Sequence, residues 1–130
     1  MVWDMTTHDP VNHPAHYCSH PSGIECIEIT EHMPFCEGNA TKYLWRSGQK
    51  GSLVEDLRKS RWYIERAIAI GRPGVRLDDA VIAKAHMVAT HDQWSLTSVA
   101  IHALTQGRHA TAIGYVNAAI SEAEAKAAST

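Results

Sequence analysis

The feature that most constrains the fold is a helical repeat that opens on a capping signal. Ser52 stands three residues before Glu55, which is the capping box in which the serine side chain accepts a hydrogen bond from the glutamate backbone N–H. Gly71 and the turn sequence GRPG mark its end. Between these signals the apolar stripe is spaced seven and then four positions apart, at Leu57, Ile64 and Ile68. The segment is therefore predicted to be an amphipathic helix with one buried face.

The same periodicity recurs along most of the chain. It predicts further helices over 24–33 (a strand is the alternative for so short a stretch), 40–46, 78–90, 93–105 and 108–126, with MPFCEGN as the break between the first two. We therefore expect a small all-α bundle of about six helices, preceded by an extended arm rich in histidine and proline. The expected units are an arm over 1–22, a helical core over 23–71 and a C-terminal helical segment over 78–127. Alternatively, the core and the C-terminal segment form one compact unit.

Charge is distributed unevenly, although the net charge is only −2. Residues 1–41 hold six acids and no lysine or arginine, whereas residues 42–66 hold seven bases and three acids. Charges that served only solubility would be spread more evenly, so this concentration of bases indicates an anionic partner. Duplex DNA is the least favoured anion, because the overall charge is slightly negative and no helix-turn-helix signature is clear.

Aromatic residues are interleaved with this basic block on two predicted helices. Lys42 and Arg46 lie four positions apart with aromatic residues between them, and the next helix repeats the mixture around Lys59. Cations beside aromatic faces suit a phosphate attached to a planar ring, so the pattern predicts a nucleotide-type ligand. The alternative places Trp62 and Tyr63 in the core and the bases in water. The candidate ligand-binding residues are His16, Tyr17, Asn39, Lys42, Tyr43, Arg46, Lys50, Lys59 and Trp62.

Two other patterns raise metal binding as an alternative. His16, Cys18 and His20 are suitable zinc ligands, but their spacing matches no zinc finger, knuckle or HExxH helix, so histidines that serve the structure or touch a ligand are favoured. Three glutamates recur at a spacing of three, which allows two of them to hold a divalent cation. A solvated acidic face, or acids paired with the basic block, is favoured instead. The metal alternative uses Glu25, Glu28, Glu31 and Asp56.

Four motifs follow one another in the first half of the chain: VNHPAHY, GIECIEITEH, GNATKYLWRSGQKG and EDLRKSRWYIER. Through them, residues 10–70 resemble the SaV-like family of small bacteriophage proteins, whose members often carry a nucleotide kinase label. The chain has no GxxxxGK[ST] loop, so kinase chemistry of the Walker type is disfavoured. The resemblance implies a phage protein, and the family pattern falls on His16, Tyr17, Glu25, Gly38, Asn39, Lys42, Tyr43, Trp45, Arg46, Lys50, Asp56, Leu57, Lys59, Trp62 and Tyr63.

A looser likeness in layout connects the chain with all-α nucleotide pyrophosphohydrolases of the MazG type. That family holds magnesium on an ExxE helix and a later ExxD helix. Glu28 and Glu31 match the first motif, whereas the sequence EDLRK has adjacent acids where the second motif is expected. The likeness therefore implies only half of a magnesium site.

The expected function is the binding of an anionic nucleotide-type ligand without turnover, and phage origin would make that ligand a host antiviral nucleotide signal. The alternatives are a divalent-metal-dependent nucleotide hydrolase and an accessory factor that binds another protein. No cofactor is expected, with Mg²⁺ as the alternative. Alanine-rich helical stripes suit tight helix packing, either within the chain or across an oligomer, and a homo-oligomer is expected. The lack of a ~20-residue apolar run argues against a membrane span. Three cysteines without a CxxC pair favour a reducing compartment, here the host bacterial cytoplasm.

Overall fold

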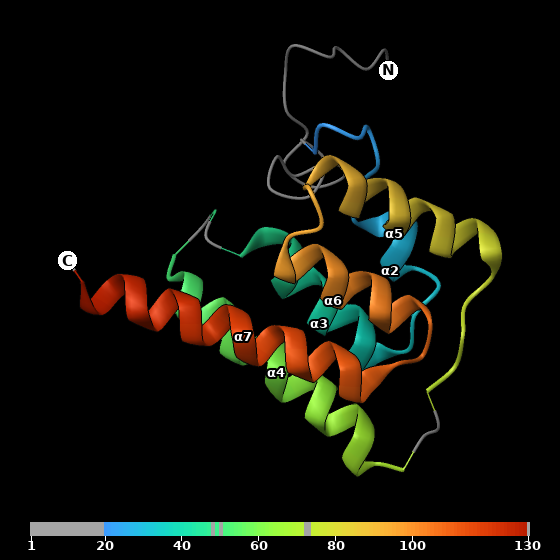
Figure 1. Ribbon diagram of the computed structural model, residues 1–130. Coiled ribbons are helices and arrows are strands. Elements are labelled where there is room, and N and C mark those ends of the chain that lie inside the picture. The colour runs from blue at the N-terminus through green and yellow to red at the C-terminus, as the bar shows by residue number, and fades with distance from the viewer. Residues whose placement is uncertain (1–19, 48, 50, 72–73, 130) are drawn as a thin grey trace, which may run out of the picture.

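The computed structural model describes residues 20–47, 49, 51–71 and 74–129, and this part of the chain contains helices and no strand. The all-α prediction is thereby confirmed, while most of the predicted arm lies outside the described residues. The helices, shown in Figure 1, are α2 (Ile27–Thr30), α3 (Phe35–Arg46), α4 (Leu53–Ala69), α5 (Asp79–His91), α6 (Leu96–Thr105) and α7 (His109–Ala128). None of these helices is both long enough and apolar enough to cross a bilayer.

Helix α4 begins as the capping box predicts, because the Ser52 side chain accepts a hydrogen bond of 3.2 Å from the Glu55 backbone N–H. Its buried face differs from the predicted stripe. Leu57 and Ile64 are buried, but Ile68 is 46% exposed, so its assignment to the core is wrong. The buried face consists of Asp56, Leu57, Ser60, Ile64 and Ala67, which leaves Ile68 at its edge, in the last turn of the helix.

The predicted break before the second helix is also wrong in part. Helix α3 begins at Phe35, five residues before the predicted start, and α2 is a single short turn. Pro34 directly precedes the first helical residue, where the missing proline N–H costs no intrahelical hydrogen bond. A proline read as a helix breaker therefore marks a helix start here. Ala40 and Leu44 are both buried, as the spacing predicts.

The C-terminal helices follow the predicted order with shifted ends. Asp78 occupies the N-cap position of α5 but its side chain makes no capping hydrogen bond. Helix α6 starts at Leu96, later than predicted, because Gln93 and Trp94 adopt left-handed φ angles of 55° and 56°. Ser95 then caps α6 by accepting a 3.4 Å hydrogen bond from the Ser98 N–H.

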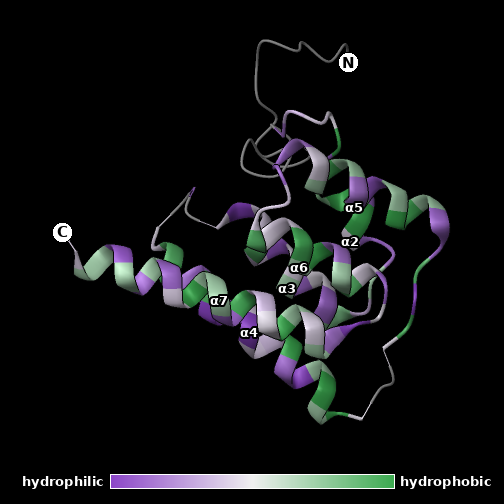
Figure 2. Cartoon of the chain, viewed as in Figure 1, coloured by the Kyte–Doolittle hydropathy of each residue, from purple (hydrophilic) through white to green (hydrophobic). Residues whose placement is uncertain are grey.

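The core is shared between the N-terminal and C-terminal helices. α3 packs against α4 and α6, and α7 lies along α4 and α6 (Figure 1). Hydrophobic and hydrophilic bands alternate along α4, α5 and α7 (Figure 2), the pattern of helices with one buried face. The largest fully buried apolar side chains come from five helices: Ile29, Leu44, Leu57, Ile64, Val88 and Val116. This shared core holds α3 at the centre of the fold, with a different environment on each of its faces.

Candidate functional site

The basic-aromatic cluster, which we define as Lys42, Tyr43, Arg46, Lys59, Trp62 and Tyr63, lies where α3 packs against α4. Its centre is the Tyr43 ring. The Arg46 Cζ atom lies 4.8 Å from the ring centroid, and the Nζ atoms of Lys42 and Lys59 each lie 5.5 Å from it. Three cationic groups from two helices thus surround one aromatic ring, all within the reach of cation–π attraction.

Aromatic contacts extend the cluster along α4. The rings of Tyr43 and Tyr63 are stacked, with centroids 6.0 Å apart and an interplanar angle of 14°. Trp62 meets Tyr63 edge-on at 5.1 Å and is 59% exposed, so the alternative that places this tryptophan in the core is wrong. Tyr63 is half-buried and packs against the core, so the alternative holds for it in part. Trp62 therefore offers a free aromatic face to the solvent.

Two carboxylates from α4 each pair with one cation of the cluster. Asp56 is buried, and its Oδ1 lies 3.3 Å from the Arg46 Nη2. Glu55 lies 3.0 Å from the Lys59 Nζ on the exposed side of the same helix. The hydrogen bond to Glu55, together with its negative charge, raises the pKa of Lys59. Among the described residues no carboxylate pairs with Lys42, so the cluster keeps cationic character.

The remaining predicted ligand-binding residues are placed less centrally or fall outside the described part. Asn39 lies one turn before Tyr43 on α3, and its Nδ2 donates a hydrogen bond of 2.9 Å to the Phe35 carbonyl. His16, Tyr17 and Lys50 lie outside the described residues. The structure therefore brings together Lys42, Tyr43, Arg46, Lys59 and Trp62 of the predicted set.

Three of the four carboxylates of the metal alternative pair with basic side chains. Glu28 accepts a 2.7 Å hydrogen bond from the Glu25 N–H and a 3.1 Å bond from the Lys84 Nζ. These contacts, the backbone bond first, lower the pKa of Glu28. Glu31 lies 3.4 Å from the His32 Nε2, and Asp56 pairs with an arginine on α3. Within the described residues, no group of three or more His, Cys, Asp or Glu side chains is arranged to hold a metal ion.

A surface hollow of about 590 Å³ adjoins the cluster at the start of α4. Lys59 and Trp62 line it together with Arg58, and these positions share one face of the helix because they lie three and four residues apart. Arg58 pairs with Glu124 of α7 at 3.2 Å, and both side chains of that pair are more than half exposed. The hollow thus presents two cations, the Glu55 carboxylate and the indole of Trp62 to the solvent.

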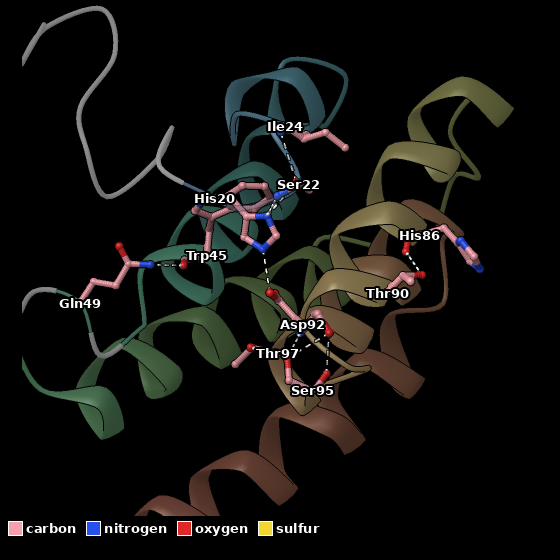
Figure 3. A network of polar contacts seen from close by, with 11 residues as sticks. His20, Ser22, Ile24, Trp45, Gln49, His86, Thr90, Asp92, Ser95 and Thr97 are labelled. Carbon is pink, nitrogen blue, oxygen red and sulfur yellow. Dashed lines mark hydrogen bonds and ion pairs between the residues drawn. The ribbon is translucent and has the colours of Figure 1, made fainter. Parts of the chain in front are cut away.

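A second site was missed by the sequence reasoning. His20 and Asp92 lie 72 positions apart in the chain, yet the His20 Nε2 and the Asp92 Oδ1 are 2.7 Å apart (Figure 3). They line a pocket of about 360 Å³ together with Trp45 and Thr97, which we call the His20 pocket. From the sequence, His20 was a possible zinc ligand, with a structural or ligand-contacting role favoured, and Asp92 was not among the candidate site residues. No local spacing signals a contact between residues so distant in the chain.

Residues 11–65 match a family model described as a protein of unknown function, DUF3310. The match spans less than half of the 130 residues and includes α2, α3 and most of α4, and hence the basic-aromatic cluster. Comparisons with curated proteins and with solved structures gave no match. The matched part and the unmatched C-terminal helices share one core, and the His20 pocket takes residues from both.

Proposed function

We propose that this protein binds an anionic nucleotide-type ligand at the basic-aromatic cluster. The observation that carries the proposal is the set of three cationic groups, from Lys42, Arg46 and Lys59, within 5.5 Å of the Tyr43 ring centroid. Phosphate oxygens are well matched by guanidinium and ammonium groups, and a base has a solvent-facing indole to stack on at Trp62.

The ion pairs of the cluster indicate which cations are available to a phosphate and which serve the structure. Glu55 and Lys59 are both exposed, so solvent screens their ion pair and a phosphate can displace the carboxylate. The Arg46–Asp56 pair is different, because the Asp56 side chain is only 4% exposed and remains in place. Lys59 and Arg58 would therefore take the phosphate in the hollow beside Trp62, while Arg46 keeps the Tyr43 ring oriented.

The finer part of the proposal concerns the biological role. The resemblance of residues 10–70 to the SaV-like phage family supports a phage protein that sequesters a host antiviral nucleotide signal. Binding without turnover is favoured over hydrolysis, because three of the four acids of the magnesium alternative, Glu28, Glu31 and Asp56, pair with separate basic groups. The homo-oligomer and the bacterial cytoplasm remain predictions, and light scattering on the purified full chain tests the first of them.

Isothermal titration calorimetry of the full chain tests the binding proposal. The panel contains mono-, di- and triphosphates of adenosine and guanosine and the cyclic mono- and dinucleotides. We expect saturable heat with at least one of them. For the nucleotide bound most tightly, Trp62→Ala and Lys59→Ala should each weaken binding about tenfold, the loss of one stacked base or one phosphate contact.

Lys126→Ala is the matched control, because Lys126 is an exposed lysine near the end of α7. Its substitution removes the same charge as Lys59→Ala without touching the cluster. It should leave the affinity unchanged within about twofold. The absence of heat from every nucleotide, with helical circular dichroism intact, contradicts the proposal. Equal losses from Lys59→Ala and Lys126→Ala contradict the placement of the site, because only net charge would then matter.

A further inference from the structure

The His20 pocket opens on the face of α3 opposite the basic-aromatic cluster. Trp45, which lines the pocket, stands two positions after Tyr43 and so points about 200° away around the helix axis. Its wall also includes Asp92, at the end of α5, and Thr97, in the first turn of α6 (Figure 3). The pocket volume of about 360 Å³ is large enough for a small organic molecule.

The hydrogen bonds around His20 indicate which of its two ring nitrogens accepts and which donates. The Ser22 backbone N–H donates to the His20 Nδ1 at 3.1 Å, and an N–H group can only donate, so the Nδ1 atom is the lone-pair acceptor. The proton of the neutral ring then lies on Nε2 and is donated to the Asp92 Oδ1 at 2.7 Å. The Ser22 hydroxyl, 2.7 Å from Nδ1, fits the same tautomer as a second donor. In this arrangement Asp92 accepts one hydrogen bond from His20, through its Oδ1 atom.

Asp92 is the one carboxylate among the described residues that line the pocket. None of the described residues that line it is a lysine or an arginine. Among the described residues, the Asp92 Oδ2 receives no hydrogen bond, and the Asp92 side chain is 34% exposed. The Thr97 hydroxyl adds a further acceptor to the lining, and the exposed ring of Pro21 adds apolar surface. The described lining thus combines a carboxylate, an indole, oxygen acceptors and a proline ring.

We propose that the His20 pocket binds a small primary ammonium ion carried on a short aliphatic chain. The ammonium group donates to the Asp92 Oδ2 and the Thr97 Oγ1, and it faces the indole of Trp45, the aromatic ring that attracts cations most strongly. The aliphatic chain lies along the exposed ring of Pro21. This ligand has the opposite charge from the nucleotide of the proposed function and a separate site, so neither proposal depends on the other.

A titration followed by ¹H–¹⁵N NMR on the full chain tests this inference. The probes are n-butylammonium chloride, 1-butanol and sodium butyrate, three molecules of similar size with positive, zero and negative charge, at equal ionic strength. We expect saturable shifts of the Asp92 and Thr97 amides and the Gln49 side-chain amide with butylammonium. The apparent affinity for butanol should be at least tenfold lower, and butyrate should leave these signals unchanged.

Asp92→Asn keeps the shape of the pocket and removes its charge, and it should weaken butylammonium binding at least tenfold. Asp79→Asn, at the exposed start of the same helix, is the matched control and should bind as the wild type does. If Asp92→Asn is unfolded, the comparison of the three probes on the wild-type chain decides alone. Equal shifts with butanol and butylammonium, shifts confined to other acidic residues, or no shifts at the pocket would overturn the proposal.

Discussion

The two faces of α3 differ in almost every property that a binding site can have. The Tyr43 face carries three cations, is open to solvent and borders a surface hollow. The Trp45 face encloses a smaller pocket with one carboxylate and no lysine or arginine among the described lining residues. Tyr43 and Trp45 are two positions apart in sequence, so one helix separates a site suited to anions from a site suited to cations.

The site built from residues close in sequence is open to solvent, whereas the site built from residues distant in sequence is more enclosed. The basic-aromatic cluster is built from residues 42–63, on two consecutive helices of one hairpin. The His20 pocket needs residues 72 positions apart, which meet only after α5 and α6 pack over α3. Local elements can place charges on an open surface, whereas an enclosed polar pocket requires walls from several elements.

The largest effect is expected where one residue supports the fold between the two faces. Leu44 is 2% exposed, lies next to Tyr43 in sequence and lines the His20 pocket. Leu44→Ala should lower the free energy of unfolding by about 3 kcal/mol, because it removes buried methyl groups and leaves a cavity. Urea denaturation followed by circular dichroism measures the loss.

The matched control is Leu53→Ala, since Leu53 is 40% exposed at the start of α4. Its expected loss is less than about 1 kcal/mol. Similar losses at both leucines would mean that the interior beneath α3 is not packed as the structure describes.

An intermediate effect is expected from the buried half of the cluster. Asp56→Asn should lower the free energy of unfolding by about 2 kcal/mol, because Arg46 then lacks the carboxylate that neutralises it. Breaking a fully buried pair costs about 3–5 kcal/mol, and the value is smaller here because the Arg46 side chain is 20% exposed. Asp79→Asn breaks the exposed pair with Arg76 and should cost less than about 0.5 kcal/mol in the same urea experiment.

The smallest effect is expected from the exposed half. Glu55→Gln removes the partner that raises the pKa of Lys59, so this pKa should fall toward the ordinary value for lysine. An NMR titration of the Lys59 side chain at alkaline pH measures the shift. Glu65→Gln breaks the comparable exposed pair with Arg61 on the same helix and should leave the Lys59 signal unchanged. An unchanged pKa in Glu55→Gln would show that the pair does not form in solution.

Much of the fold was predictable from local signals. The capping box before α4, the buried positions Ala40 and Leu44, and the order of the helices all follow from periodicity and capping chemistry. The errors occur where a local rule has two outcomes. Pro34 starts a helix instead of ending one, and left-handed residues at 93 and 94 delay α6. Such ambiguities are resolved by packing and not by propensity.

The candidate sites divide in the same way. The cations and aromatics of the basic-aromatic cluster were predicted because i, i+3 and i, i+4 spacings already group them on helical faces. The stacking of Tyr43 on Tyr63, and the difference between exposed Trp62 and half-buried Tyr63, required the packing of α3 on α4. Nothing in the spacing of His20 and Asp92 indicates that they meet.

The sequence alone predicts that this chain forms helices and where most of them lie. It also shows that the bases are concentrated on the second and third of the predicted helices. These properties depend on residues within a few turns of one another, so a local reading of the chain reveals them. Only the tertiary structure shows that Glu28 pairs with Lys84 and that Asp56 is buried against Arg46. It also shows the pocket lined by Asp92 on the face of α3 opposite the basic-aromatic cluster. Those contacts join residues from different helices, and their formation depends on which apolar faces pack together in the shared core.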